Sequence, residues 1–335
     1  MSISGHRGEA HGAQTAGGGR GAPVADLRND RLTGATSLVV PPWSTAKAAN
    51  PAVVALELPV GTVPCPFCPV AIDDGTHSAG EETGRVPGGA RHPLWSSVSL
   101  RNRWPQTVAV DAAEVVVLSD VHDAHLGDLD LDEASAAMGL LLRRAESQRR
   151  AGRFPLVFVN HGVNAGSSQP HPHGQVVGLP EADPGSRREA EALGAGSCVL
   201  CEELPGELTV ARVPGATVVV PEAPTVDYDQ TVVLDGHGPA TARAVAHGVQ
   251  AALRALYAVT GPVAYNLVVH ESGHAHVHVV PRTGWHSGYE LAGVHTCYVD
   301  PAVAAERLRA ASETLARRSR PHEAGLAFDP EGDAA

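Results

Sequence analysis

The sequence predicts an α+β protein that contains two tandem copies of one strand–helix–strand unit. Each half carries a Cys-x-x-Cys pair, then a histidine, then a His-x-His motif, in the same order. Each half also contains one long amphipathic segment of helical period, and apolar, β-branched runs follow both His-x-His motifs. We expect the two units to span residues 24–185 and 186–320, with disordered tails at 1–23 and 321–335.

The composition indicates a globular protein without a broad electrostatic affinity for polyanions. Hydrophobic residues make up 43% of the 335 residues, and no apolar run approaches the roughly 18 residues of a membrane span. The 25 basic and 37 acidic residues give a net charge of -12, which argues against nucleic acid or a membrane as partner. Four of the five cysteines form the two Cys-x-x-Cys pairs, which is typical of metal or redox sites in a cytoplasmic protein.

Four segments are predicted to be helical. Asp132–Arg150 begins with acidic residues and ends with arginines, which complements the helix dipole at both ends. The other three are Ser186–Leu193, Thr241–Val259 and Pro301–Arg318.

Apolar and β-branched runs predict the strands, and Gly-rich or charged stretches predict the loops. The expected strands are Ser37–Val40, Val53–Leu58, Val108–Leu118, Leu156–Asn160, Gln175–Leu179 and Thr217–Val220, followed by a hairpin of Ala264–His270 and His276–Val280. Asp26–Gly34 is turn-rich, and Asp73–His92 is expected to be an exposed loop.

Cysteine and histidine side chains form two sets whose chemistry suits a metal ion. Two thiolates plus two imidazoles match the N/S ligand preference of Zn²⁺. The sets are Cys65, Cys68, His122 and His171 in the first half and Cys198, Cys201, His237 and His274 in the second. Buried free cysteines beside unrelated histidines, or a redox-active dithiol, are the alternatives that the residues alone leave open. The sequence therefore predicts one zinc site, with the second set as a further candidate.

The block 160–175 carries the candidate reaction chemistry. Its small-residue loop has the composition that lets a backbone approach a phosphate closely. The loop leads into His171-Pro-His173, where an extended backbone would place both histidines on one face. A neutral imidazole can attack phosphorus directly, and Gln175 and Ser168 would donate hydrogen bonds to the non-bridging oxygens. Two structural histidines are the alternative.

These motifs together resemble the galactose-1-phosphate uridylyltransferase family of the histidine-triad superfamily. The matching stretches are LRNDRLTG at 27–34, CPFC at 65–68, RNRWP at 101–105, SDVH at 119–122, NHGVNAGSSQPHPHGQ at 160–175, GYEL at 288–291 and PAVAAERLR at 301–309. The CVLC pair with His237 and His274 resembles a second zinc site of the branch that includes ADP-glucose phosphorylases. The uridylyltransferase branch often binds its second metal through a glutamate and three histidines, for which the candidates here are Glu189, His270, His276 and His278.

The resemblance implies duplicated histidine-triad-like units, mainly antiparallel sheet flanked by helices, and a ping-pong nucleotidyl transfer. His173 would be the nucleophile, Gln175 and Ser168 would orient the phosphoryl group, and His171 would complete a zinc site with Cys65, Cys68 and His122. The residues expected to bind substrate are Arg28, Asn102, Asn160, Gly166 and Ser167. The implied partners are a nucleotide sugar, a sugar 1-phosphate or inorganic phosphate, and a second copy of the chain in a homodimer.

Two departures from the family pattern leave specificity open. Trp43 stands where the family has a substrate-binding arginine. The stretch His274-Ala-His276-Val-His278 resembles the triad of the superfamily's nucleotide hydrolases, which makes His276 a rival nucleophile. The leading hypothesis is transfer of UMP between a UDP-sugar and a hexose 1-phosphate. The alternatives are an ADP- or GDP-sugar phosphorylase, a histidine-triad hydrolase, and a zinc-stabilised nucleotide sensor without turnover.

Overall fold

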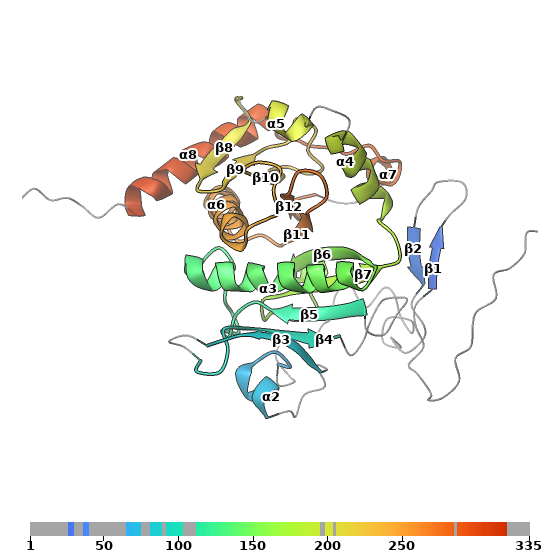
Figure 1. Cartoon of the computed structure of the whole chain (residues 1–335). Helices are drawn as coiled ribbons and strands as arrows, with labels where there is room; N and C mark the ends of the chain where they lie inside the picture. Colours follow the sequence, from blue (N-terminus) through green and yellow to red (C-terminus); the bar gives the residue numbers. More distant parts are fainter. Residues whose placement is uncertain are drawn as a thin grey trace, which may run out of the picture.

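A computed structural model describes residues 26–29, 36–39, 65–74, 81–88, 92–102, 112–194, 198–203, 206–284 and 287–319 (Figure 1). For residues 26–29, 36–39, 202–203 and 319 the description covers the backbone only. Both expected tails, the expected strand Val53–Leu58 and Trp43 lie outside the described residues.

One ten-stranded antiparallel sheet forms the centre of the fold, in the order β3-β4-β5-β7-β6-β11-β12-β10-β9-β8. The strands of the first half are β3 (Glu82–Val86), β4 (Ser97–Arg101), β5 (Ala113–Val117), β6 (Phe154–His161) and β7 (His173–Leu179). Those of the second half are β8 (Thr209–Val213), β9 (Ala216–Val219), β10 (Gln230–Leu234), β11 (Tyr265–His270) and β12 (His276–Pro281). A separate two-stranded sheet pairs β1 (Asp26–Asn29) with β2 (Thr36–Val39).

The two halves of the large sheet repeat one topology. Counted from its outer edge, each half has its first three strands in chain order, then its fifth strand, then its fourth. The two fourth strands, β6 and β11, pair with each other at the centre. The predicted fold class, a duplicated α+β unit with mainly antiparallel sheet, is therefore confirmed.

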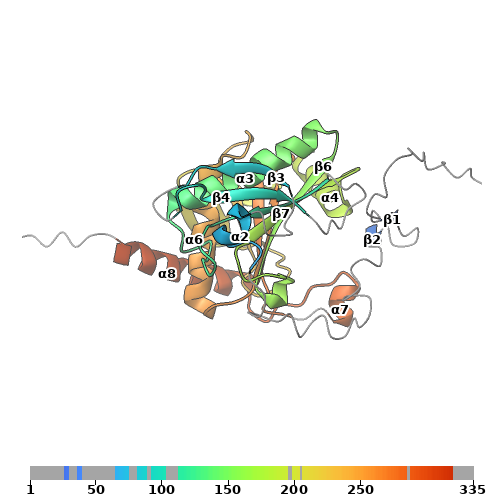
Figure 2. The ribbon, with the colours of Figure 1, turned by 90° about the horizontal axis from the view of Figure 1, so that it is seen from below.

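Three long helices cover one face of the sheet (Figures 1 and 2). They are α3 (Leu131–Arg150), α6 (Ala242–Thr260) and α8 (Pro301–Ser319), as the sequence predicts to within one residue at each end. The Asp130 side chain caps α3 by accepting from the Glu133 backbone N–H at 2.7 Å, and Thr241 caps α6. The remaining helices are α2 (Pro69–Asp73), α4 (Pro184–Gly194), α5 (Val199–Glu203), α7 (Gly288–Leu291) and the 3-10 turn η2 (Val163–Ala165). Among the described helices, none combines the length and the apolar character that a membrane crossing needs.

Strand alternation assigns the two faces of the sheet to different tasks. Val157 and Val159 of β6 and Leu267 of β11 are buried in the same core cluster as the long helices. Because successive side chains on a strand point to opposite faces, the residues between them point away from the helices. The face opposite the helices therefore receives Asn160, His173, Asn266 and His276.

Two of the expected loops contain strands. The interval Asp73–His92 was expected to be a loop, but it contains β3, an edge strand that is largely accessible and has a register shift between Glu82 and Gly84. Both features remove the alternation of apolar and polar residues that identifies a half-buried strand. Asp26–Gly34 likewise contains β1, and β4, β8 and β10 were not expected.

A partly buried cluster of polar rings lies beneath the central strand pair, on the helix-covered face. The His161 ring stacks on Tyr265 with centroids 4.8 Å apart, and the His125 ring meets His161 edge-on at 4.8 Å. Burial lowers the pKa of His161 to about 4, and the neighbouring His125 lowers it further in the same direction. The fold thus keeps this imidazole neutral.

This neutral imidazole predicts a loss of stability in acid. The unfolded chain takes up the proton of His161 near pH 6.5 and the folded chain only near pH 4. The contribution of neutral His161 to the free energy of unfolding is therefore complete above pH 6.5. It is lost as the pH falls towards 4, and the loss is about 3 kcal/mol at most. His161→Phe keeps the ring stacking and should flatten this dependence, measured as urea unfolding free energies between pH 7.5 and pH 4.

The control is His295→Gln, which changes an exposed histidine and should keep the wild-type dependence. Loss of bound metal in acid would affect all three proteins alike. Equal pH dependence of wild type and His161→Phe would contradict the assignment.

Candidate active site and metal centres

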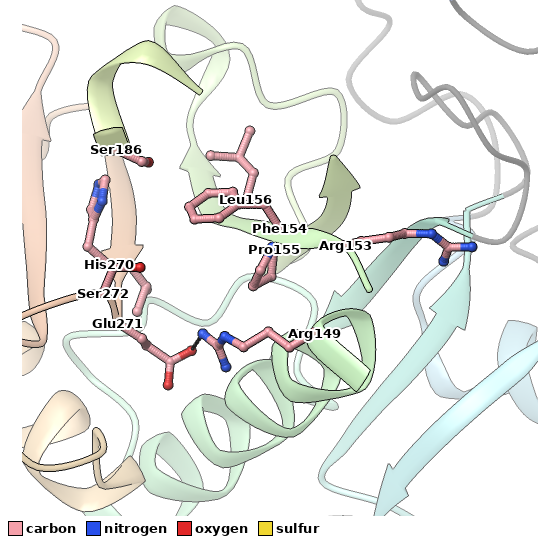
Figure 3. A pocket seen from close by; sticks show the side chains of 10 residues that line it. Arg149, Arg153, Phe154, Pro155, Leu156, Ser186, His270, Glu271 and Ser272 are labelled. Carbon is pink, nitrogen blue, oxygen red and sulfur yellow. Dashed lines mark hydrogen bonds and ion pairs between the residues drawn. The ribbon is translucent and has the colours of Figure 1, made fainter. Parts of the chain in front are cut away.

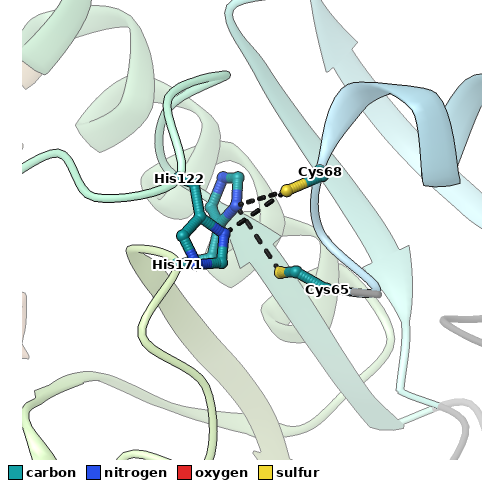
Figure 4. Close-up of side chains that lie close together, drawn as sticks. All are labelled: Cys65, Cys68, His122 and His171. Atoms are coloured by element: carbon teal, nitrogen blue, oxygen red, sulfur yellow. Dashed lines mark hydrogen bonds between the residues drawn. The ribbon is translucent and has the colours of Figure 1, made fainter. Parts of the chain in front are cut away.

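The first Cys/His set meets at the end of β7 next to α2 (Figure 4). Cys65 and Cys68 precede α2, His122 follows β5, and His171 precedes β7. Cys68 Sγ lies 3.3 Å from His122 Nδ1 and 3.8 Å from His171 Nδ1, and Cys65 Sγ lies 3.7 Å from His171 Nδ1. The structure therefore brings together the four residues that the sequence predicted.

The donor atoms of this set fit a tetrahedral metal ion. With metal–sulfur and metal–nitrogen bonds of about 2.3 and 2.05 Å, a tetrahedron has S···N edges of roughly 3.5 Å, close to the distances found. His171 Nε2 donates to the Ser119 carbonyl at 2.8 Å, which leaves the Nδ1 lone pair facing the thiols. Burial and the nearby Cys65 thiol raise the pKa of Cys68 to about 11. A metal ion offsets that penalty because a coordinating thiol is deprotonated.

The second Cys/His set repeats the arrangement in the second half. His274 Nδ1 lies 3.2 Å from Cys198 Sγ and 3.4 Å from Cys201 Sγ, and His237 Nε2 lies 3.5 Å from Cys201 Sγ. As with His171, the Nε2 of His274 bonds to a backbone carbonyl, that of Leu234, at 2.6 Å. Cys201 and His237 are exposed, so this set is more open to solvent than the first.

A third cluster unites the glutamate and three histidines that only the resemblance suggested. Glu189 comes from α4, and its carboxylate lies 2.9 Å from His270 Nδ1, 3.5 Å from His276 Nε2 and 3.3 Å from His278 Nε2. Burial acts to raise the pKa of Glu189, but the three imidazoles beside its carboxylate outweigh this effect and hold this pKa well below its usual range. Among the described residues, these three sets are the groups whose donor atoms could hold a metal ion.

His173 is a buried imidazole whose Nδ1 is held by a hydrogen bond. Its Nδ1 lies 2.9 Å from the His171 carbonyl, to which it donates, so Nε2 carries the lone pair. Burial lowers the pKa of His173, which keeps the ring neutral. The Phe67 ring packs against it with centroids 5.0 Å apart. The arrangement presents a neutral, oriented imidazole.

His276 has the same backbone bond and a different environment. Its Nδ1 donates to the His274 carbonyl at 2.7 Å, but its Nε2 faces the Glu189 carboxylate. His270 and His278 pack their rings against it at 4.9 and 5.0 Å. The Nε2 of His276 thus points at a carboxylate in the third cluster, and this environment differs from that of His173.

Polar groups on the same sheet face surround His173. Gln175 lies two residues farther along β7, and the register places Asn160 of β6 beside His173. The loop after β6 turns through Gly162 and Gly166, whose φ angles of 84° and 81° favour glycine. Ser168 in this loop is exposed. The small residues of the loop would let its backbone approach a phosphate closely.

The remaining predicted residues are less directly placed. Ser167 is buried and its hydroxyl donates to the Gln169 carbonyl at 2.8 Å, so it stabilises the loop. Asn102 follows β4 and bonds through its backbone to Ala113, at the end of β5 away from His173. The side chain of Arg28, in β1, lies outside the described part of the chain.

A cavity of about 200 Å³ lies at the opposite end of the β6–β11 pair, and Figure 3 shows the side chains that line it. An ion pair between Arg149 and Glu271 lies at its edge, and His270 of the third cluster lines it. Its floor is formed by apolar side chains of β6, including Leu156. The cavity therefore belongs to the neighbourhood of the third cluster and not to that of His173.

Two residues near His173 escaped the sequence analysis. Both come from the second half: Asn266 donates a hydrogen bond to Asn160, and Arg282 donates one to Asn266. Phe67, inside CPFC, contacts the His173 ring. The available signal was Asn266 itself, a polar residue inside the apolar run of β11.

The fold is an α+β arrangement of two repeated units, each with a Cys/His set and a His-x-His motif. No family model matches the chain. The sequence is similar to ADP-glucose phosphorylase of Arabidopsis thaliana, 24% identical over 340 residues that cover 86% of this chain and 94% of the relative. It is also similar to galactose-1-phosphate uridylyltransferase of Streptomyces lividans, 29% identical over 160 residues that cover 44% and 41% of the two chains.

Solved structures share the fold. A uridylyltransferase structure superposes with a TM-score of 0.67 at 22% identity, and it covers 86% of this chain and 98% of its own. The structure of the Arabidopsis thaliana ADP-glucose phosphorylase with bound ADP-glucose gives a TM-score of 0.65 at 21% identity, with the same coverage. The similarity that the sequence motifs predicted is thus confirmed.

Removal of a ligand from the first Cys/His set is expected to cost both metal and stability. Cys65→Ser should lose about one equivalent of bound metal, measured by elemental mass spectrometry, and its Tm should fall by about 10 °C because structural metal binding contributes folding free energy. Cys297→Ser is the matched control, since Cys297 lies outside all three sets. Full metal content in Cys65→Ser would contradict the assignment.

Proposed function

We propose that this protein transfers a nucleoside monophosphate through a covalent nucleotidyl-histidine formed at His173. The observation that carries the proposal is the His173 imidazole, which is buried, neutral and held through Nδ1, so that Nε2 carries the lone pair, on the sheet face that also carries Asn160 and Gln175. The similar curated proteins are by name a phosphorylase and a uridylyltransferase, which supports the same class of transfer.

The proposed reaction has two displacement steps. In the first, His173 Nε2 attacks the α-phosphorus of a nucleoside diphosphate sugar, a nitrogen–phosphorus bond forms, and the bond to the bridging oxygen breaks to release a sugar 1-phosphate. In the second, an oxygen of the acceptor attacks the same phosphorus and the imidazole leaves. The His171 carbonyl accepts the hydrogen bond from Nδ1–H throughout and so stabilises the positive charge that the ring gains.

Donors on the same sheet face would bind the non-bridging oxygens. Gln175, the Asn160 amide, Ser168 and the backbone N–H groups near Gly166 are the groups assigned to this task. Each supplies a hydrogen bond that strengthens as negative charge builds on the phosphoryl oxygens. The family resemblance alone adds Arg28, Asn102 and Ser167 to the proposed substrate-binding set.

The first Cys/His set is proposed to hold Zn²⁺, and the second to hold another. When bound, the ion supplies a structural cross-link between the α2 turn and the strand end. Within the chain, this turn carries Phe67, which contacts the His173 ring, and His171 supplies the carbonyl that orients that ring. The set therefore fixes two of the contacts of the nucleophile.

UMP transfer between a UDP-sugar and a hexose 1-phosphate is the leading assignment. An ADP-glucose phosphorylase activity is the second candidate, because the similarity to that protein extends along 86% of the chain and the second Cys-x-x-Cys set is present. Hydrolysis at His276 is disfavoured by the Glu189 carboxylate on its Nε2. We also propose that the chain is a cytoplasmic enzyme that acts as a homodimer.

Intact-mass spectrometry without acceptor tests the proposal. UDP-glucose or ADP-glucose should add one nucleoside monophosphate, which peptide mapping should place on residues 171–175. His173→Ala should abolish the adduct, whereas His276→Ala, the matched control in the repeated motif, should retain it. An adduct on the 274–282 peptide, or the absence of an adduct with every nucleotide sugar, would refute the proposal.

The acceptor is then identified by discharge of the adduct. Release by hexose 1-phosphate and not by inorganic phosphate would establish the uridylyltransferase reaction. The reverse result, with ADP-glucose as donor, would establish the phosphorylase.

A further inference from the structure

A chain of side-chain hydrogen bonds crosses from the second half of the sheet into the site around His173. Arg282, which follows β12, donates from Nε to Asn266 Oδ1. Asn266, on β11, donates from Nδ2 to Asn160 Oδ1 at 2.6 Å and to the Ala165 carbonyl at 3.0 Å. One residue of the second half thus contacts both Asn160 and the loop that would cradle the phosphate.

The chemistry of these groups allows only one direction of donation. A guanidinium can only donate and a backbone carbonyl can only accept, so Arg282 and Ala165 together fix which end of the Asn266 amide is which. The Asn160 oxygen is then the acceptor, and its NH2 group is the end left to face the loop. Consistent with this, Asn160 Nδ2 lies 3.9 Å from where a Cβ on Gly166 would stand.

The loop itself rests against the start of β11. A Cβ on Gly162 would come within 2.8 Å of the Ala264 Cβ, so only glycine permits this close approach. Ala264 in turn accepts from the Arg282 backbone N–H at 2.7 Å. Loop, Asn160 and the second half are therefore held in one arrangement.

We propose that Asn266 and Arg282 are positioning residues for nucleotidyl transfer at His173. They hold the Asn160 amide with its NH2 group towards the phosphoryl oxygens and fix the loop beside it. This role rests on the proposed function, and it makes transfer in one half of the sheet depend on side chains of the other half.

The matching position around His276 in the second half has no equivalent of the hydrogen bond between Asn266 and Asn160. The register places His270 where the first half has Asn160, and Leu156 where the second half has Asn266. Leu156 has no hydrogen bond to donate. The difference agrees with the assignment of transfer to His173 alone.

Asn266→Asp provides the sharpest test because it removes the NH2 donor of this side chain and keeps its size and shape. The aspartate still accepts from Arg282, but it offers only acceptors to Asn160, whose amide is then expected to turn its NH2 group towards β11. The rate of His173 adduct formation at saturating nucleotide sugar, followed by quenched-flow mass spectrometry, should fall about 10- to 100-fold, while the donor Kd changes less than about threefold.

Companion variants separate positioning from folding. Arg282→Met should lower the same rate about tenfold, Arg282→Lys should recover part of it, and the double variant Arg282→Met/Asn266→Asp should be less than additive because both act through one chain of bonds. Arg254→Met is the matched control: Arg254 of α6 bonds to the Gly127 carbonyl, away from the site, and this variant should keep the wild-type rate. Melting temperatures of all variants report folding.

The outcomes are distinct. Wild-type rates in folded Asn266→Asp and Arg282→Met, or equal losses in Arg254→Met, would overturn the positioning role and leave the proposed function standing. Failure of the wild-type protein to form an adduct with UDP-glucose, ADP-glucose or GDP-mannose would overturn the proposed function and this role with it.

Discussion

The antiparallel pairing of β6 with β11 is the contact on which the arrangement of the sites depends. It joins two five-stranded halves edge to edge, and its register brings Asn160 opposite Asn266. Because strand side chains alternate, the same register sends Val157, Val159 and Leu267 into the helix-covered core. A slip of one residue would exchange the two faces, so burial of the core and assembly of the site are fixed by one constraint.

The two halves have the same backbone topology but carry different side chains at matching positions. Both place an imidazole two residues after a Cys/His ligand and hold its Nδ1 with the carbonyl of that ligand. In the second half, His270 and His278 occupy the places of Asn160 and Gln175, and α4 adds the Glu189 carboxylate. A carboxylate with three imidazoles favours a cation, whereas amides around a lone imidazole favour an anionic phosphoryl group. The same fold thus supports two kinds of site.

The sequence predicted those features that depend on local order and could not predict those that depend on register. The Cys/His sets can be recognised from residue spacing and the long helices from the period of their apolar residues, so the sequence alone predicts both. Strands β3 and β10 gave no clear signal, because β3 lies at an accessible edge and β10 is buried throughout without alternation. The bond between Asn160 and Asn266 joins residues 106 positions apart. Only the strand order brings them together.

The burial of His173 can be understood from the charge that the proposed reaction would create. Burial disfavours a protonated ring, so the imidazole is neutral before reaction. Once Nε2 bonded to phosphorus, the ring would become cationic, beside phosphoryl oxygens of opposite charge and with Nδ1–H already bonded to the His171 carbonyl. The same burial that penalises an isolated charge therefore strengthens this paired one, since electrostatic attraction grows as water is excluded. This attraction requires the ring, the loop and the amides to be in place before the substrate binds. The first Cys/His set would support that arrangement from one side, and Asn266 would support it from the other.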